Sequence, residues 1–180
     1  MNRTNCIERA GEILIHTIWI EKRLVDFLIL KKHPTLIKKI NISSVIPRTM
    51  SDERFEYWEK NFGPILKEYI KEFNPTDSWK ENLEGVMYWR DIIGHGYVSL
   101  YKSYLLYRPD TTRSGKSVKQ LRSVLKPSKT TEKKPRKFTL KIDLSDDVKY
   151  ENMKKIILEI DEVYFKHEAN KLGLNYEKIR

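Results

Sequence analysis

The sequence has a single cysteine, Cys6, among its 180 residues. No disulfide can form within one chain, which is typical of a reducing compartment and predicts a cytoplasmic protein. The sequence also has no Cys pair, no His-Glu-x-x-His motif and no run of clustered carboxylates, so it offers no familiar metal site. The P-loop and Gly-x-Gly-x-x-Gly patterns that hold phosphates are absent as well. The sequence therefore predicts neither a bound metal nor a cofactor.

Long hydrophobic runs are also missing. The most apolar stretch, residues 13–30, is interrupted by polar side chains, namely His16, Glu21, Lys22, Arg23 and Asp26. A membrane-spanning helix needs roughly 20 mostly apolar residues, so this stretch is expected to be an amphipathic core helix. At the N-terminus, Glu8, Arg9 and Glu12 interrupt any apolar start, and no signal peptide is expected. The sequence predicts a protein without membrane contact.

Acidic residues are scarce in one segment, residues 108–141, which we call the basic segment. It has twelve Lys or Arg against two acids, Asp110 and Glu132, and its net charge of +10 equals that of the whole chain. A block of this kind predicts contact with a polyanion, namely nucleic acid. The alternative is a solvated loop that only keeps the protein soluble. The candidate RNA-binding residues are Arg108, Arg113, Lys116, Lys119, Arg122, Lys126, Lys133, Lys134, Arg136 and Lys137.

Apolar spacing and helix breakers predict a mostly helical chain. A first helix is expected over residues 5–32, ended by His33-Pro34, and a linker with a short apolar stretch (residues 36–42) follows it. Ser51 is expected to cap a second helix that reaches about Phe62, where Gly63-Pro64 bends or restarts it toward Phe73. A third helix is expected from Ser78, and its stripe continues through Val98 to Tyr107.

The C-terminal part is predicted to hold one more long helix. Within the basic segment we expect a short helix over residues 118–125 and, because apolar and polar residues alternate, a short strand over residues 138–142. Ser145-Asp146-Asp147 should cap the last helix, which reaches Leu172. The expected fold is all-α: an antiparallel bundle of four or five helices forming one domain (1–180), with a basic loop and short-strand insertion (108–144) before the last helix.

The clearest chemical motif is the octet Arg90-Asp91-Ile92-Ile93-Gly94-His95-Gly96-Tyr97. A histidine can move a proton near neutral pH, and an arginine clamps phosphate oxygens with its planar fork of donors. Positions five apart diverge by about 140° on a helix, so Arg90 and His95 share one site only if the helix breaks or a partner completes it. The two glycines indicate a break or a close backbone approach by a ligand or another helix. The plain alternative is a buried histidine and a surface arginine.

The octet resembles the signature of HEPN-domain ribonucleases, in which an arginine and a polar residue precede a histidine after a short spacer. Here Arg90, Asp91 and His95 match that motif. The resemblance implies a helical bundle that dimerises, so that two motifs line one cleft, and that cuts RNA without a metal. In this interpretation His95 transfers protons, Arg90 holds the scissile phosphate and Asp91 orients one of the two. The expected products are a 2′,3′-cyclic phosphate and a 5′-hydroxyl.

The resemblance extends to Tyr97, two residues after the histidine. In HEPN toxins that are paired with minimal nucleotidyltransferase antitoxins, a tyrosine at that position can be nucleotidylated to silence the toxin. The resemblance therefore implies a toxin of a toxin–antitoxin pair or an antiphage effector, with such an antitoxin as a candidate partner. A non-catalytic HEPN-like module that binds nucleic acid or a partner protein through the basic segment is the second interpretation. A helical DNA-binding regulator is the third and weakest, because no helix-turn-helix signature stands out.

Two further groups of residues are candidates. Glu12 and His16 lie four residues apart on the first helix and are candidate auxiliary residues of the cleft, although such a pair is more often a plain surface contact. Tyr97, Tyr101 and Tyr104 have helical spacing and could stack on bases, but a core or dimer stripe is the favoured interpretation.

Overall fold

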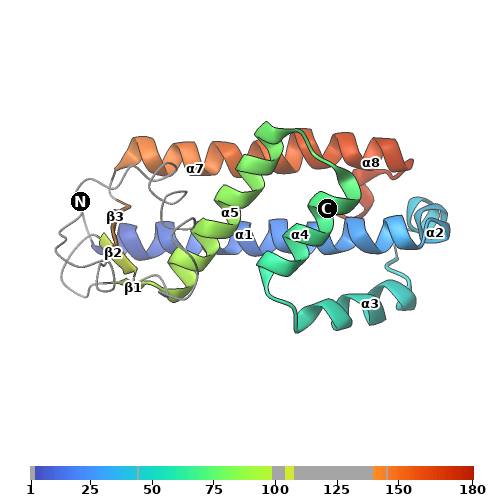
Figure 1. Ribbon diagram of the computed structural model, residues 1–180, viewed down its shortest axis with the longest axis horizontal. Helices are drawn as coiled ribbons and strands as arrows, with labels where there is room; N and C mark the ends of the chain where they lie inside the picture. The colour runs from blue at the N-terminus through green and yellow to red at the C-terminus, as the bar shows by residue number, and fades with distance from the viewer. Residues whose placement is uncertain (1–2, 44, 99–103, 108–139, 145) are drawn as a thin grey trace. The chain divides into compact units, whose positions relative to one another are not determined.

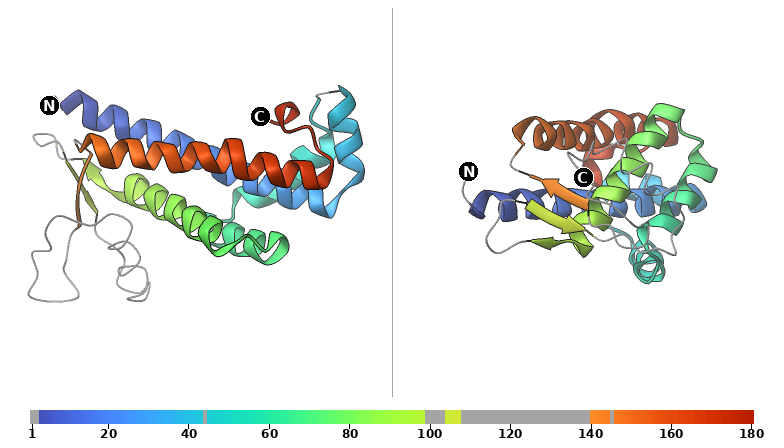
Figure 2. Two further views of the ribbon diagram at one scale, coloured as in Figure 1. Left: turned by 90° about the horizontal axis from the view of Figure 1, so that it is seen from above. Right: turned by 60° about the vertical axis from the view of Figure 1, so that its left-hand side comes forward.

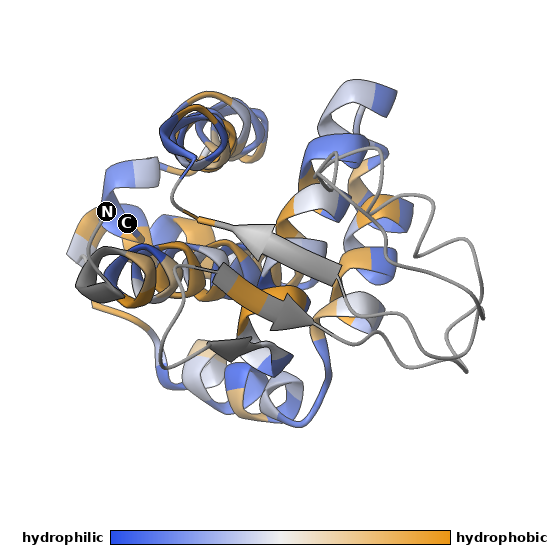
Figure 3. Ribbon diagram, turned by 90° about the vertical axis from the view of Figure 1, so that its left-hand side faces the viewer, coloured by the Kyte–Doolittle hydropathy of each residue, from blue (hydrophilic) through white to orange (hydrophobic). Residues whose placement is uncertain are grey.

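The computed structural model describes residues 3–43, 45–98, 104–107, 140–144 and 146–180. Its elements, in chain order, are α1 (Arg3–Lys32), α2 (Thr35–Ser43), α3 (Arg48–Trp58), α4 (Phe62–Phe73), α5 (Asp77–His95), β1 (Tyr97–Val98), β2 (Tyr104–Tyr107), β3 (Leu140–Asp143), α7 (Asp147–Glu159), the π-helical turn η1 (Ile160–Phe165), α8 (Lys166–Leu172) and the 3₁₀ turn η2 (Tyr176–Lys178) (Figure 1). The described chain is mostly helical, in agreement with the predicted class. Several helices show one hydrophobic and one hydrophilic side (Figure 3).

The first helix agrees with the sequence pattern. α1 ends at Lys32, where His33-Pro34 interrupts the helical pattern. Its core side is formed by buried residues at helical spacing, among them Cys6, Ala10, Ile13 and Thr17. Within the described ranges, no helix is both long enough and apolar enough to cross a membrane.

Two predictions for the next helices are wrong. The linker was expected to reach Pro47, but its apolar stretch (residues 36–42) lies inside the helix α2, whose Leu36, Ile37 and Ile40 are buried. An apolar i, i+1, i+4 pattern needs only nine residues to bury one helical face. Ser51 does not cap α3. That helix begins at Arg48 after Pro47, whose φ of −62° already suits a helix start, and no side chain caps it.

The predicted helix through Tyr107 is also wrong. α5 ends at His95, and the chain continues as a three-stranded antiparallel sheet of order β1-β2-β3 (Figure 2). Tyr97 pairs with Leu106 in β1 and β2, and Leu105 pairs with Ile142 in β2 and β3. Aromatic and branched residues suit strands, and pairing with a segment far along the chain overrides the local helical spacing.

The remaining elements lie close to the predicted ones. The expected strand over residues 138–142 overlaps β3, while its first two residues and the predicted short helix over 118–125 lie outside the described residues. The last helix is capped by Asp146, whose Oδ1 accepts from the Lys149 N–H at 3.2 Å. It reaches Leu172 as α7, η1 and α8, with one π-helical turn in its middle. Gly173, with φ of 73°, ends it.

The chain forms two compact units, and the divisions between them fall inside α1, α5 and α7. The first unit comprises Met1–Thr17 and Gly85–Lys155. Its core includes Cys6 and Ala10 of α1 together with Leu144, and Ile93 of α5 packs against this cluster. The first unit contains the whole octet.

The second unit comprises Ile18–Glu84 and Ile156–Arg180 and has an aromatic core. The ring centroids of Phe27 and Phe165 are 5.3 Å apart, and Tyr69 stacks on Phe73 at 4.4 Å. Trp79 stacks on Tyr164 at 5.0 Å. Aromatic pairs at these distances add to the hydrophobic stabilisation of a core.

A buried ionic group also lies in the second unit. Asp26, which is completely buried, accepts a hydrogen bond from Arg54 Nε at 2.6 Å, and its other oxygen lies 3.0 Å from Arg23 Nη1. The same Arg23 donates to the Ile179 carbonyl. Burial lowers the pKa of Arg23, an effect that the charge of Asp26 opposes. Asp26 therefore joins α1 to α3, and Arg23 joins α1 to the C-terminal segment.

Candidate active site

Helix α5 holds the charged residues of the octet. It runs without a break through His95, so Gly94 does not interrupt it. Arg90 Nη1 lies 3.8 Å from Asp91 Oδ1, and both side chains are partly buried. On this unbroken helix Arg90 and His95 diverge by about 140°, whereas Asp91 and His95 lie one turn apart and diverge by about 40°. The helix therefore groups Asp91 with His95 and turns Arg90 away from the imidazole.

His95 is the last residue of α5 and is exposed. An imidazole at that position is accessible to a bound molecule and is not a core residue, so the buried-histidine alternative is wrong. A proton-transfer role requires such access, because the ring must come within hydrogen-bond distance of the reacting group.

The two glycines beside His95 have different structural causes. A Cβ on Gly96 would lie 2.5 Å from the Ile92 carbonyl oxygen and would collide with the side chain of Leu105, which is completely buried on β2. Gly96 therefore permits the close approach of the end of α5 to the sheet. A Cβ on Gly94 would meet only Leu14 Cδ1, at 4.0 Å. The close approach at Gly96 is to strand β2 of the same chain, and not to the ligand or other helix that was predicted.

Tyr97 follows directly on β1, and the structure describes its backbone but not its side chain. The helical tyrosine stripe is wrong, because Tyr97 and Tyr104 lie on strands while Tyr101 lies outside the described residues.

Glu12 and His16 belong to a polar cluster between α1 and α7. Tyr150 donates to Glu12, and Lys154 Nζ lies 2.8 Å from Glu12 Oε1. His16 Nε2 is 3.9 Å from the same oxygen, and Arg9 lies over the Tyr150 ring at 4.5 Å. Hydrogen bonds from Lys154 and Tyr150 lower the pKa of Glu12. Burial and the bond to Glu12 raise the pKa of Tyr150.

These contacts place the pair on a different side of α1 from the octet. Gly94 of α5 faces Leu14 of α1. Leu14 and Glu12 are two positions apart and therefore point about 160° away from each other around the helix. The observed role of Glu12 is to join α1 to α7, and its auxiliary role in a cleft remains a prediction. Tyr150 and Lys154 were not predicted. The i, i+4 spacing of Tyr150 and Lys154 can be seen in the sequence, but their shared partner, Glu12, lies 138 positions before Tyr150.

The candidate RNA-binding residues, Arg108 to Lys137, lie outside the described residues. Lys141 lies on β3, and its side chain is not described. Among the residues that are described, no group of three or more His, Cys, Asp or Glu is arranged to hold a metal ion.

No protein-family model, no curated protein and no solved structure matches this chain. The functional argument therefore depends on the chemistry of the octet.

Proposed function

We propose that the chain is a metal-independent endoribonuclease of HEPN type. The observation that carries the proposal is the end of α5, where an exposed imidazole, His95, stands one helical turn after a carboxylate that is paired with Arg90. An imidazole that transfers protons and a guanidinium that binds phosphate, brought together by a second chain, supply what cleavage of a phosphodiester with its own nucleophile needs.

In the proposed reaction the ribose 2′-oxygen attacks the adjacent phosphorus while the bond from phosphorus to the 5′-oxygen breaks. His95 accepts the proton of the 2′-hydroxyl, and a second imidazole or the same ring returns a proton to the leaving 5′-oxygen. Arg90 stabilises the negative charge that develops on the phosphate oxygens. Asp91 orients Arg90 or His95. The products are a 2′,3′-cyclic phosphate and a 5′-hydroxyl.

The active form is proposed to be a homodimer. Because α5 is unbroken, His95 and Arg90 of one chain point about 140° apart. Two α5 helices facing each other would bring the arginine of one chain to the histidine of the other. The HEPN resemblance implies a dimer in which two motifs line one cleft. The same resemblance supports a cytoplasmic toxin or antiphage effector. A nucleotidyltransferase antitoxin that modifies Tyr97 would be its partner.

The test is RNA cleavage in EDTA. Wild type should cut RNA and release 2′,3′-cyclic phosphate ends, and His95→Ala or Arg90→Ala should lower the rate by about 100-fold or more. His167→Ala removes a different exposed histidine, and Arg48→Ala removes an exposed arginine that also lies 3.8 Å from a carboxylate, Asp52. Both controls should cut like wild type. Equal cleavage rates for His95→Ala and wild type would refute the proposed role of His95 in RNA cleavage.

The charge distribution favours a second candidate function. The basic segment holds the whole net charge of the chain, which suits a non-catalytic module that binds nucleic acid through phosphate contacts. Such a module would not cleave RNA, and Arg90→Ala and His95→Ala would leave its affinity unchanged. Its affinity would fall steeply with salt, and replacing lysines of the basic segment by glutamine would flatten that dependence.

A further inference from the structure

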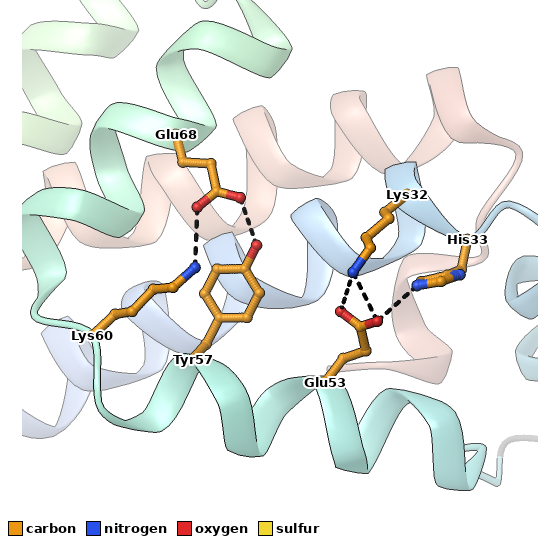
Figure 4. Close-up of polar contacts among 6 residues, drawn as sticks. All are labelled: Lys32, His33, Glu53, Tyr57, Lys60 and Glu68. Carbon is orange, nitrogen blue, oxygen red and sulfur yellow. Dashed lines mark hydrogen bonds and ion pairs between the residues drawn. The ribbon is translucent and has the colours of Figure 1, made fainter.

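Helix α3 is held against the rest of the second unit by several polar contacts. Its buried apolar side chains are limited, among the described residues, to Met50. Glu53 binds Lys32 Nζ at 2.8 Å and His33 Nε2 at 2.9 Å, and the Tyr57 hydroxyl donates to Glu68 at 2.6 Å (Figure 4). Together with the bond from Arg54 to Asp26, these contacts fix which side of α3 faces the protein.

The part of α3 that faces solvent exposes two large aromatic side chains. Phe55 is 76% exposed and Trp58 is 85% exposed. They are three positions apart and diverge by about 60°, so they share one side of the helix. Tryptophan and phenylalanine are enriched in the centres of binding interfaces. Because polar residues anchor the helix, both rings stay exposed to solvent, where a binding partner can contact them.

Three exposed acidic residues lie on the same helix as these rings, and one of them, Asp52, lies 3.8 Å from the exposed Arg48. Asp52, Glu56 and Glu59 are exposed, and together with Phe55 and Trp58 they form what we call the α3 face. A cation is attracted to the charge of a carboxylate and, separately, to the face of an aromatic ring, so a surface that has both binds cations by two interactions. Contacts of the second kind already occur in this chain, where Lys60 Nζ lies 3.9 Å from the Tyr57 ring. The same carboxylates repel nucleic acid and anionic lipid.

We infer that the α3 face binds a lysine- and arginine-rich protein segment, namely residues 108–141 of a second copy of this chain. Charge complementarity is the argument: the basic segment has a net charge of +10, and it accompanies every copy of the protein. Trp58 and Phe55 stack against its lysine and arginine side chains, and Glu56 and Glu59 pair with their charges. The contact is independent of whether His95 cleaves RNA.

The experiment uses a fluorescein-labelled peptide with the sequence of residues 108–141. Its anisotropy is measured while the full-length protein is added at low salt. The peptide should bind, and added salt should weaken binding because exposed charges are screened. Trp58→Ser should weaken it about 2- to 30-fold, and the double substitution Glu56→Lys with Glu59→Lys should abolish it.

Two substitutions on α7 serve as matched controls. Val148→Ser replaces another exposed hydrophobic residue, and Glu151→Lys reverses another exposed acid. Both should bind the peptide like wild type. Circular dichroism of each variant checks that the protein stays folded. We expect it to, because the substituted side chains are exposed. Peptide binding that is absent, or equal in the α3-face variants and the controls, would overturn the inference.

Sedimentation equilibrium tests whether the segment comes from a second copy. The mean mass of wild type should rise with protein concentration more steeply than that of Trp58→Ser, and salt should remove the difference. Identical mass profiles for the two proteins would rule out the contact between copies. His95→Ala should behave like wild type here, so a failed nuclease and a failed α3 contact give different results.

Discussion

Gly96 lies against Leu105 so closely that no larger residue fits between them. A Cβ at position 96 would be 2.8 Å from Leu105 Cγ and 2.5 Å from the Ile92 carbonyl oxygen. Leu105 is completely buried, and the carbonyl belongs to the backbone of α5, so neither atom can easily give way. This contact sets the position at which α5 ends, and therefore the position of His95 directly before it.

The two glycines of the octet should respond oppositely to alanine. Gly96→Ala forces the end of α5 away from the sheet, and we expect it to lower the free energy of unfolding by about 1–3 kcal/mol. Since it displaces His95, it should also slow RNA cleavage by about 100-fold. Gly94→Ala should keep cleavage and gain up to about 1 kcal/mol of helix stability. Urea unfolding and a cleavage assay measure both effects; equal behaviour of the two variants would refute this account of Gly96.

Mixing two inactive variants tests the composite site. If Arg90 of one chain acts with His95 of the other, Arg90→Ala and His95→Ala homodimers are both inactive, but half of the dimers in an equal mixture are heterodimers with one complete site. The mixture should recover about one quarter of the wild-type cleavage rate. Dilution below the dissociation constant should abolish this recovery. A mixture as inactive as its components would mean that both residues act within one chain.

The buried carboxylate of Asp26 should be important for stability. Asp26→Ala leaves Arg23, whose side chain is 2% exposed, and Arg54 without the charge that they share. Breaking a buried ion pair on one side costs about 3–5 kcal/mol, measured as the change in the free energy of unfolding in urea. Asp52→Ala breaks an exposed pair with Arg48 and should cost less than about 1 kcal/mol. A similar loss in both variants would contradict the role assigned to burial.

Much of the helical architecture could be predicted, because its signals are local. His33-Pro34 marks the end of α1, and Asp146 caps α7 where the sequence places a cap. Residues 104–107 could not be predicted, since their tyrosine spacing also fits a helix. What decides their structure is pairing with β3, which lies more than thirty positions further along the chain.

The candidate site divides in the same way. The angle between Arg90 and His95 follows from helix geometry alone and was available from the sequence. The reason for Gly96 was not, because it depends on Leu105 from the next hairpin. The partners of Glu12 were hidden for the same reason: Tyr150 and Lys154 approach it only when α1 and α7 lie together.

The attachment of α3 should depend on pH through Glu53. Hydrogen bonds from Lys32 and then His33 lower the pKa of Glu53 below its usual 4.5. A carboxylate with a lowered folded-state pKa stabilises the fold above its unfolded pKa, and this stabilisation disappears as pH falls through the folded value. The hydrogen bond to Glu53 also raises the pKa of Lys32 above 10.5. The Glu53–Lys32 pair therefore stabilises the fold at pH values between the pKa of Glu53 and the pKa of Lys32.

We therefore expect Glu53→Gln to melt at a lower temperature than wild type at neutral pH, and the difference to shrink steadily as pH falls below 4.5. Glu56→Gln, an exposed neighbour on the same helix, is the matched control and should melt like wild type throughout. Thermal unfolding from about pH 3 to about pH 9 measures both variants. A Glu53→Gln difference that stayed constant across this range would show that the carboxylate charge does not hold α3, and that its hydrogen bonds alone do.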